Sequence, residues 1–264
     1  MNKLLIPVAE IFSSIQGEGP NTGLKVIFCR VAGCDFRCSW CDSKFAQCVT
    51  KDTVNYTSDE LYEALKNKCD LDGIRHIVFT GGNPCLYTPL GSVILKLLEE
   101  GIKSDIETQG SILPDWLNFC DNVIISPKAP SSKMPDVYEH IEKWFKKIMN
   151  DFFTTDRTNV VIKIPVFSVN DLEFVRTYYE LYQKFNKVIP LKFYINVGND
   201  NTTEPGDISP RILANYRKLV DMIMKTEWMN LQVISATNSS LWRVTIGNWR
   251  KMLFSQFLLS RGIT

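Results

Sequence analysis

The stretch VIFCRVAGCDFRCSWC, residues 26–41, joins a short apolar run to a group of cysteines. The run at 26–28 predicts a β-strand, because β-branched and aromatic residues favour extended backbone. Cys34, Cys38 and Cys41 follow it within one short loop. In folds built from parallel strands the loops after the strands carry the active site, so these cysteines are placed where chemistry is expected.

Strand and helix signals alternate along the rest of the chain. Thr57 and Glu60 form a capping box that opens one helix. Thr88 as a cap with Pro89 at the first helical position predicts the start of another, and Asn170 with Glu173 predicts the start of a third. The predicted strands are 26–28, 74–79, 103–106, 122–125, 160–164, 188–195 and 231–234, and the predicted helices are 57–69, 88–101, 135–149, 170–185 and 210–225.

This alternation indicates an α/β fold with parallel strands and crossover helices. The chain offers about six or seven units, fewer than the eight of a closed barrel. We therefore expect a partial, open TIM-type barrel of about six parallel β/α units. No domain boundary is visible, so residues 1–264 are interpreted as one domain, with a core at about 8–235 and a tail of different character at 236–264.

Composition excludes several function classes. The chain has 264 residues, of which 45% are hydrophobic, and a formal net charge of +1. That charge does not indicate a nucleic-acid partner. The start of the chain does not resemble a signal peptide, and no run approaches the ~18–20 apolar residues that a spanning helix needs, so we expect a cytoplasmic protein without a membrane partner. Only two histidines are present, which disfavours a histidine-based site.

The clustered cysteines point to a metal. Four of the eight cysteines fall between Cys29 and Cys41, and the others are scattered. Three thiolates in one loop can hold three irons of a [4Fe–4S] cluster and leave the fourth iron open to a small molecule. The alternative is structural zinc with Cys29 as a fourth ligand. Cys29 lies inside an apolar strand, and the spacing differs from paired C-x2-C motifs, so the cluster is favoured.

The spacing C-x3-C-x2-C with Trp40 before the last cysteine resembles the signature of the radical S-adenosylmethionine superfamily. That resemblance implies that the open iron binds the amino and carboxylate groups of S-adenosylmethionine, whose cleavage gives a 5′-deoxyadenosyl radical. The turn from Thr80 to Pro84 resembles the superfamily's GGE segment, which lines the amino group, with Asn83 in place of glutamate. Asparagine brings no charge, so that contact is expected to be weaker or to use backbone carbonyls.

The segments around the cysteines narrow the resemblance. The ordered set Gln-Gly-Glu-Gly (16–19), Phe-x-Arg (28–30), the three cysteines and Cys-Asp-Ser (41–43) is similar to the 7-carboxy-7-deazaguanine synthase family. Glu-Thr-Gln-Gly (107–110), Ser-Pro-Lys (126–128) and Lys163 match in the same order, over about residues 8–175. The resemblance implies ring contraction of 6-carboxy-5,6,7,8-tetrahydropterin, a small pterin substrate, with loss of ammonia, assisted by Mg²⁺.

The resemblance also implies roles for individual residues. The expected cluster ligands are Cys34, Cys38 and Cys41, and the expected Mg²⁺ ligand is Ser43. Expected S-adenosylmethionine contacts are Trp40, Cys41, Asp42, Gly82, Asn83, Glu107, Ser126, Lys128 and Lys163. Expected substrate contacts are Ile15, Gln16, Gly17, Glu18, Arg30 and Thr80. A surface ion pair between Glu107 and Lys128 stays an alternative for those two residues, and turn positions stay an alternative for Gln16 and Glu18.

The resemblance weakens after about residue 190. Family members usually carry a Pro-Gln-x-His segment after the last strand, whereas this chain has Gln232-Val233-Ile234-Ser235. The family further implies a homodimer and an electron donor such as flavodoxin or ferredoxin. Two other functions stay open from the sequence: another small radical S-adenosylmethionine enzyme, such as a glycyl-radical activase, and a non-enzymatic zinc-binding protein.

Overall fold

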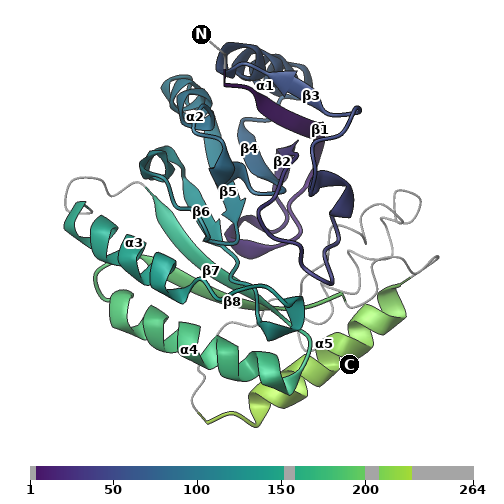
Figure 1. The fold of residues 1–264 in the computed structure, drawn as a ribbon, viewed down its shortest axis with the longest axis vertical. Helices are drawn as coiled ribbons and strands as arrows, with labels where there is room; N and C mark the ends of the chain where they lie inside the picture. Colours follow the sequence, from purple (N-terminus) through teal and green to yellow (C-terminus); the bar gives the residue numbers. More distant parts are fainter. Residues whose placement is uncertain (1–3, 152–157, 200–207, 228–264) are drawn as a thin grey trace.

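The structure, a computed structural model, describes residues 4–151, 158–199 and 208–227. Its strands form one eight-stranded sheet in the order β3-β1-β2-β4-β5-β6-β7-β8 (Figure 1). The strands are β1 (Ile6–Ile15), β2 (Lys25–Val31), β3 (Val54–Tyr56), β4 (His76–Gly81), β5 (Lys103–Thr108), β6 (Asn122–Ile125), β7 (Asn159–Val166) and β8 (Leu191–Val197). The α-helices are α1 (Ser58–Asp72), α2 (Leu90–Glu99), α3 (Tyr138–Asp151), α4 (Val169–Phe185) and α5 (Ser209–Met224). Short 3-10 turns are η1 (Gly19–Asn21), η2 (Lys44–Ala46), η3 (Pro84–Leu86), η4 (Asp115–Phe119) and η5 (Pro130–Ser132).

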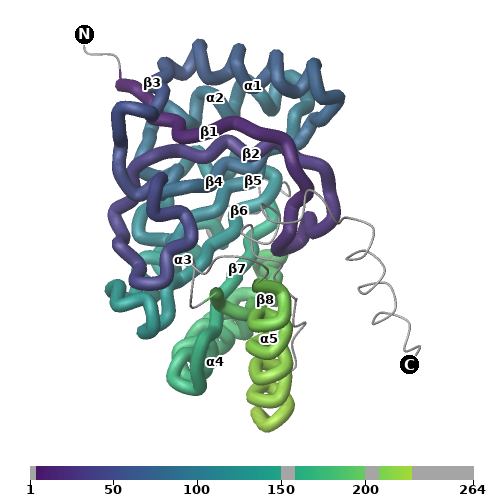
Figure 2. Tube along the Cα trace, turned by 90° about the vertical axis from the view of Figure 1, so that its right-hand side faces the viewer, coloured from purple at the N-terminus to yellow at the C-terminus, as the bar shows by residue number. Residues whose placement is uncertain are grey.

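The parallel part of the sheet confirms the predicted open barrel. β2, β4, β5, β6, β7 and β8 pair in parallel, each with the next. Figure 2 shows the strands from β1 to β7 following one another down the molecule in sheet order. β1 and β3 add an antiparallel extension that the sequence did not predict. β1 was missed because its side chains are mostly half-buried and show no clean alternation of polar and apolar residues.

The helix boundaries follow the predictions with two corrections. Pro89, predicted at the first helical position of α2, is instead its N-cap residue, because the helix begins at Leu90. Thr57 and Glu60 form the capping box at the start of α1 as predicted. The predicted N-terminal box of Asn170 with Glu173 is wrong, because α4 begins one residue earlier and Ser168 occupies the N-cap position. The carboxylate of Asp171 instead accepts hydrogen bonds from the backbone N–H groups of Phe167 and Ser131. The predicted strand at 231–234 and the tail at 236–264 lie outside the described residues.

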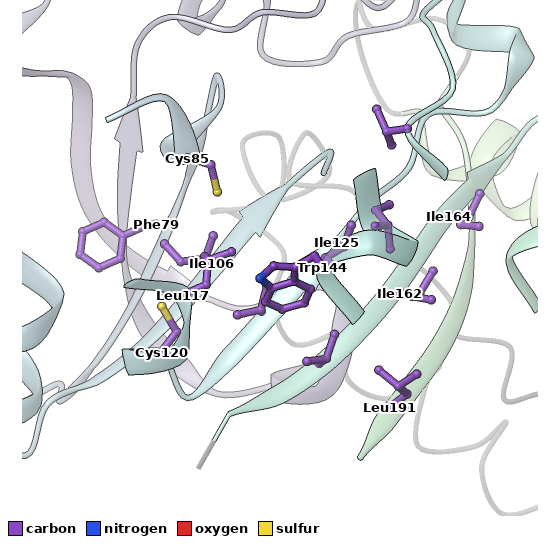
Figure 3. Packing of buried hydrophobic residues seen from close by; sticks show 14 of the residues in the cluster. Phe79, Cys85, Ile106, Leu117, Cys120, Ile125, Trp144, Ile162, Ile164 and Leu191 are labelled. Atoms are coloured by element: carbon purple, nitrogen blue, oxygen red, sulfur yellow. The ribbon is translucent and has the colours of Figure 1, made fainter. Parts of the chain in front are cut away.

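One face of the sheet packs against the helices. Alternate residues of the parallel strands, together with apolar residues of all five α-helices, make one buried cluster. Figure 3 shows part of it, with Trp144 of α3 among side chains from β5, β6 and β7. Because side chains alternate along a strand, the intervening residues point to the opposite, concave face. No helix of the described ranges is long and apolar enough to cross a membrane.

The concave face carries apolar and polar side chains next to one another. Ile124, Val161 and Tyr194 form a small apolar group on it. Glu107 on β5 pairs in register with Ile124, Lys163 on β7 pairs with Tyr194, and Thr80 lies near the end of β4 on the same face. Polar side chains near the carboxyl ends of the parallel strands therefore lie beside an apolar group, and this is where the sequence predicted the site.

Candidate functional site

The three clustered cysteines lie in the loop that leaves β2. Backbone bonds tie the start of this loop to η2 and the residue after it: the Gly33 N–H donates to the carbonyl of Ala46 at 2.8 Å, and the Cys34 N–H donates to that of Gln47 at 3.0 Å. Cys34 and Cys41 are half-buried and Cys38 is buried, and no disulfide joins them. Burial raises the pKa of the Cys38 thiol to about 11, although the nearby Lys128 opposes the rise. Binding iron at this thiol would therefore release a proton.

The three thiols of the loop lie close enough to influence one another electrostatically. Cys34, Cys38 and Cys41 lie within electrostatic range of one another, and Lys128 acts on all three. In the described part of the chain, no three His, Cys, Asp or Glu side chains come together in a way that would hold a single ion. Cys29, the proposed fourth ligand of a zinc site, is fully buried in the helix-facing core, where burial raises its pKa to about 12. Thiolates that bind different irons need not converge on one point.

The glycine turn after β4 packs on the backbone of the cysteine loop. A Cβ on Gly82 would lie 1.9 Å from the carbonyl oxygen of Gly33. Gly81 has a φ of +116°, which side chains rarely adopt. The N–H groups of Gly82 and Asn83 donate to the carbonyls of Val31 and Gly33. These glycines are therefore needed for close approach of two protein segments, in addition to any approach of a ligand.

Asn83 has a fully buried side chain that bonds only to protein. Its carbonyl oxygen accepts from the Thr108 hydroxyl at 2.9 Å and the Cys85 N–H at 3.2 Å. Its amide nitrogen donates to Asp35 Oδ1 at 3.0 Å and Ser111 Oγ at 3.2 Å. The side chain predicted to face the cofactor amino group therefore makes all four of these hydrogen bonds to protein groups. Its amide links the cysteine loop to the ends of β4 and β5.

Trp40 forms a wall beside the cysteine loop. Its ring lies 4.7 Å from that of Phe167, measured between centroids, and Lys128 Nζ lies 5.7 Å from its centroid. Its indole N–H donates to the Ser131 hydroxyl at 3.2 Å. Lys128 also donates to Ser126 Oγ at 2.9 Å, and burial lowers its pKa. Trp40, Ser126 and Lys128, three of the residues predicted to contact the cofactor, therefore lie together.

Asp171 supports this wall and was missed as a site residue. Its side chain is fully buried, and its two oxygens accept from the N–H groups of Ser131 and Phe167, the two residues that touch Trp40. A buried carboxylate that receives backbone N–H groups at a helix start is a capping arrangement. Such a residue can be recognised in a sequence as a sign of a helix start, but not as a support for Trp40.

Replacing Asp171 by alanine is expected to loosen the Trp40 wall. The change removes two hydrogen bonds to a charged group and leaves two N–H groups without their acceptor, which costs about 2–3 kcal/mol of unfolding free energy. Thermal unfolding should show the loss, and tryptophan fluorescence should report a more exposed indole. Asp136→Ala, which loses a bond to Tyr178 on the same helix, is a control that should leave Trp40 unchanged. Equal fluorescence changes in both variants would contradict the assignment.

A charged network lies on the concave face beside the apolar group of Ile124, Val161 and Tyr194. Glu107 accepts from the Thr80 hydroxyl at 2.7 Å and from the Gln16 amide at 3.2 Å. Lys163 donates to Glu18 Oε2 at 2.6 Å and lies 3.9 Å from Glu107 Oε1. The structure therefore joins residues predicted separately for substrate and cofactor, and the alternative ion pair of Glu107 with Lys128 is wrong.

The network fixes the charges of its members. Burial alone would raise the pKa of Glu107, but Lys163, Thr80 and Gln16 outweigh it and lower the pKa. Burial alone would lower the pKa of Lys163, but Glu18 and Glu107 outweigh it and raise the pKa. At neutral pH Glu107 is therefore a carboxylate that accepts hydrogen bonds, and Lys163 is an ammonium that donates them.

Arg30 and Ser43 form a second polar group on β2 and the loop after the cysteines. The Arg30 Nε–H donates to Glu10 at 2.7 Å, and its NH1 group donates to Ser43 Oγ at 3.3 Å. Ser43 in turn donates to Asp42 Oδ1 at 3.1 Å. Arg30 is buried, and Glu10 and Ser43 use only two of the N–H donors of its guanidinium. The other donors can bind an anionic ligand.

The turn after β1 brings its residues to the concave face. Ile15 ends β1, Gly17 is buried, and the Glu18 N–H donates to the Gln16 side chain at 3.2 Å. Further along, Asn21 donates to Asp105 Oδ2 at 2.6 Å and anchors η1 to β5. Gln16 and Glu18 are therefore more than turn residues, because they reach β5 and β7. No sequence pattern predicted the Asn21 anchor, because it depends on a contact between distant segments.

Asn196 is a further residue that sequence reasoning missed. It lies near the end of β8, is 8% exposed, and pairs in register with Pro165, two positions beyond Lys163. Its Oδ1 has no hydrogen-bond partner in the described part of the chain. A buried amide oxygen without a donor is costly, and such groups often face a ligand. We count Asn196 with the site on that ground.

The chain is similar to known proteins in sequence and in fold. Residues 29–178 match the sequence profile of the Radical SAM superfamily. A 7-carboxy-7-deazaguanine synthase of Bacillus subtilis (strain 168) is 37% identical over 90% of this chain and 96% of that protein, and one of Bacillus cereus is 33% identical over the same shares. QueE from Escherichia coli has a similar fold, with a TM-score of 0.61 at 23% identity over 89% of this chain and 95% of that chain.

Proposed function

Because this chain belongs to the radical S-adenosylmethionine superfamily and, within it, to the 7-carboxy-7-deazaguanine synthase family, we propose that it contracts the ring of 6-carboxy-5,6,7,8-tetrahydropterin. The products would be 7-carboxy-7-deazaguanine and ammonia, and the atoms of substrate and products balance without an added oxidant. The proposed cofactors are a [4Fe–4S] cluster on Cys34, Cys38 and Cys41, S-adenosylmethionine and Mg²⁺.

The observation that carries the proposal is the meeting of two groups of residues. The turn after β1 contributes Gln16 and Glu18, and the parallel strands contribute Thr80, Glu107 and Lys163 to the same hydrogen-bonded network. A pterin carries an edge of alternating N–H donors and carbonyl or ring-nitrogen acceptors. Ionised carboxylates, an ammonium and an amide supply the complementary acceptors and donors.

The residues of the chain would bind and orient the substrate. When bound, the cluster and S-adenosylmethionine supply abstraction of a hydrogen atom from carbon. Arg30 would bind the substrate carboxylate through the donors not used by Glu10 and Ser43. Glu107, held ionised, would accept N–H groups of the pterin, and Lys163 would donate to its oxygen. Trp40 with Phe167 would keep water from the reacting atoms.

Ser43 is the proposed Mg²⁺ ligand. Its hydroxyl lies between Arg30 and Asp42, and both Ser43 and Asp42 supply the hard oxygen atoms that Mg²⁺ prefers. Mg²⁺ keeps several waters, so substrate oxygens would complete its shell. The homodimer and a flavodoxin or ferredoxin as electron donor belong to the same proposal.

The test is anaerobic reconstitution with iron and sulfide, followed by incubation with S-adenosylmethionine, a reductant and 6-carboxytetrahydropterin. We expect 7-carboxy-7-deazaguanine by mass spectrometry and a lower rate when Mg²⁺ is removed by a chelator. Ser43→Thr keeps the hydroxyl and should respond to Mg²⁺ as the unchanged chain does, whereas Ser43→Ala should need more Mg²⁺. A full cluster without product would refute the synthase activity and leave the superfamily. Purified protein with zinc and no iron would refute both.

A further inference from the structure

Asp35 is an exposed carboxylate held in a fixed position beside the first cysteine of the loop. Its Oδ1 atom accepts from the Gln109 amide at 2.6 Å and from the Asn83 amide at 3.0 Å. These donors come from the turns after β5 and β4, so Asp35 is fastened to two neighbouring strand ends. Its other oxygen, Oδ2, receives no protein donor in the described part of the chain. A carboxylate oxygen can accept more than one hydrogen bond, so Oδ2 remains available to a ligand.

Among the described residues no ion pair joins Asp35 to a cation, unlike the other carboxylates near the site. Glu10 pairs with Arg30, and Glu18 and Glu107 pair with Lys163. Within the described ranges, the partners of Asp35 are two neutral amides. An oriented carboxylate with a free oxygen and no cation favours a ligand that carries N–H donors and positive charge.

Asn83 cannot provide such a contact through its side chain. It is fully buried, and both its carbonyl oxygen and its amide nitrogen make two hydrogen bonds to protein. One of these bonds is to Asp35. The buried amide therefore presents a neighbouring, exposed carboxylate without adding a charge of its own.

We propose that Asp35 binds the α-amino group of S-adenosylmethionine through Oδ2. This proposal depends on the proposed function in one respect, namely that the cofactor is S-adenosylmethionine. The sulfonium group of the cofactor is positive but donates no hydrogen bond, whereas the amino group offers N–H donors, and the cofactor carboxylate would be repelled. Asp35 also follows Cys34 directly, so a ligand held at the cluster would lie close to it.

The variant Asp35→Asn separates charge from loop structure. The asparagine oxygen can still accept hydrogen bonds from Gln109 and Asn83, so the loop stays attached to the two turns. The other carboxylate oxygen is replaced by an NH2 group, which presents N–H donors to the ligand. We expect an unchanged iron content and a 10- to 100-fold higher Kd for S-adenosylmethionine in anaerobic equilibrium dialysis, the range for one lost charge-assisted hydrogen bond. Asp52→Asn, at an exposed turn, is the matched control and should leave the Kd unchanged.

Two further measurements test which group of the cofactor is bound. A competitor in which hydrogen replaces the α-amino group should displace labelled cofactor from both proteins with the same Kd. The ¹⁵N coupling from amino-labelled S-adenosylmethionine to the reduced cluster should differ between Asp35→Asn and the unchanged chain. An unchanged Kd and coupling in Asp35→Asn would overturn the proposal, as would equal weakening of cofactor and competitor. Tight, amino-dependent cofactor binding without conversion of the pterin would refute the proposed function and leave this inference standing.

Discussion

Cys38→Ala is expected to yield a protein that holds no stable [4Fe–4S] cluster and makes no product. Cys38 is the central cysteine of the loop, and Lys128 acts on its thiol and on those of both neighbours. Two remaining thiolates would leave a second iron without a protein ligand. After anaerobic reconstitution, the iron content and the visible absorbance of the cluster should fall to background, while far-ultraviolet circular dichroism should stay close to that of the unchanged chain.

Cys29→Ala is the matched control on the preceding strand. Its thiol is fully buried on the helix-facing side of β2, so its loss creates a small cavity and a moderate fall in stability. Cluster absorbance and iron content should be retained. Loss of metal from both variants would favour a site with four thiolates and contradict the three-cysteine assignment.

Lys163→Met is expected to destabilise the protein and to abolish substrate turnover. Lys163 is 8% exposed and lies between Glu18 and Glu107. Its removal leaves two carboxylates without their cation, and breaking a buried pair in this way costs about 3–5 kcal/mol. Because both carboxylates are partly exposed, we expect the lower end of that range, which corresponds to a fall in Tm of roughly 6–12 °C for a chain of this size. Differential scanning calorimetry measures it.

The effect of Lys163→Met should depend on pH in a defined direction. The pKa of Glu107 is lowered from 4.5, so its stabilising contribution is present above that pH and is lost as the pH falls through the lowered value. The pKa of Lys163 is raised from 10.5, so its contribution is present below that pH and is lost as the pH rises further. The stability difference between the two proteins should be largest between about pH 4.5 and 10.5 and should shrink in acid.

Two control variants make this test specific. Lys163→Met with Glu18→Gln removes one of the two uncompensated charges and should recover part of the lost Tm. Lys96→Met removes an exposed pair with Asp59 at a similar distance, 2.7 Å, and should change the Tm little. An equal fall for the exposed and the buried pair, or a fall that grows in acid, would contradict the electrostatic account.

Much of the fold followed from local patterns in the sequence. Strands β4 to β7 lie close to their predicted ranges because their β-branched residues are buried on both faces and are bounded by clear turn signals. The capping box of Thr57 with Glu60 fixed the start of α1. β1 was not predicted, because its stability comes from pairing with β2 and β3 and its own pattern is weak.

The sequence predicted which residues belong to the candidate site, but it predicted few of the contacts between them. Cys34, Cys38 and Cys41 are close in the sequence, so their loop was visible from spacing alone. The replacement of the superfamily's glutamate by Asn83 was visible as well, but its link to Asp35 was not. Asn196 carried no motif, and only burial of its unpartnered oxygen marks it.

The sequence by itself determined the cysteine loop, the glycine turn and the alternation that makes a parallel sheet, because each depends on residues within a few positions of one another. The tertiary structure alone decided that Lys163 pairs with Glu18, 145 positions away. It also decided that the Asn83 side chain bonds to protein groups, and that Asp35 is fixed through Oδ1 while Oδ2 accepts no bond from the described residues. Hydrogen bonds and ion pairs act over a few ångströms, so the partner of a polar side chain is set by which strand ends the folded sheet brings together.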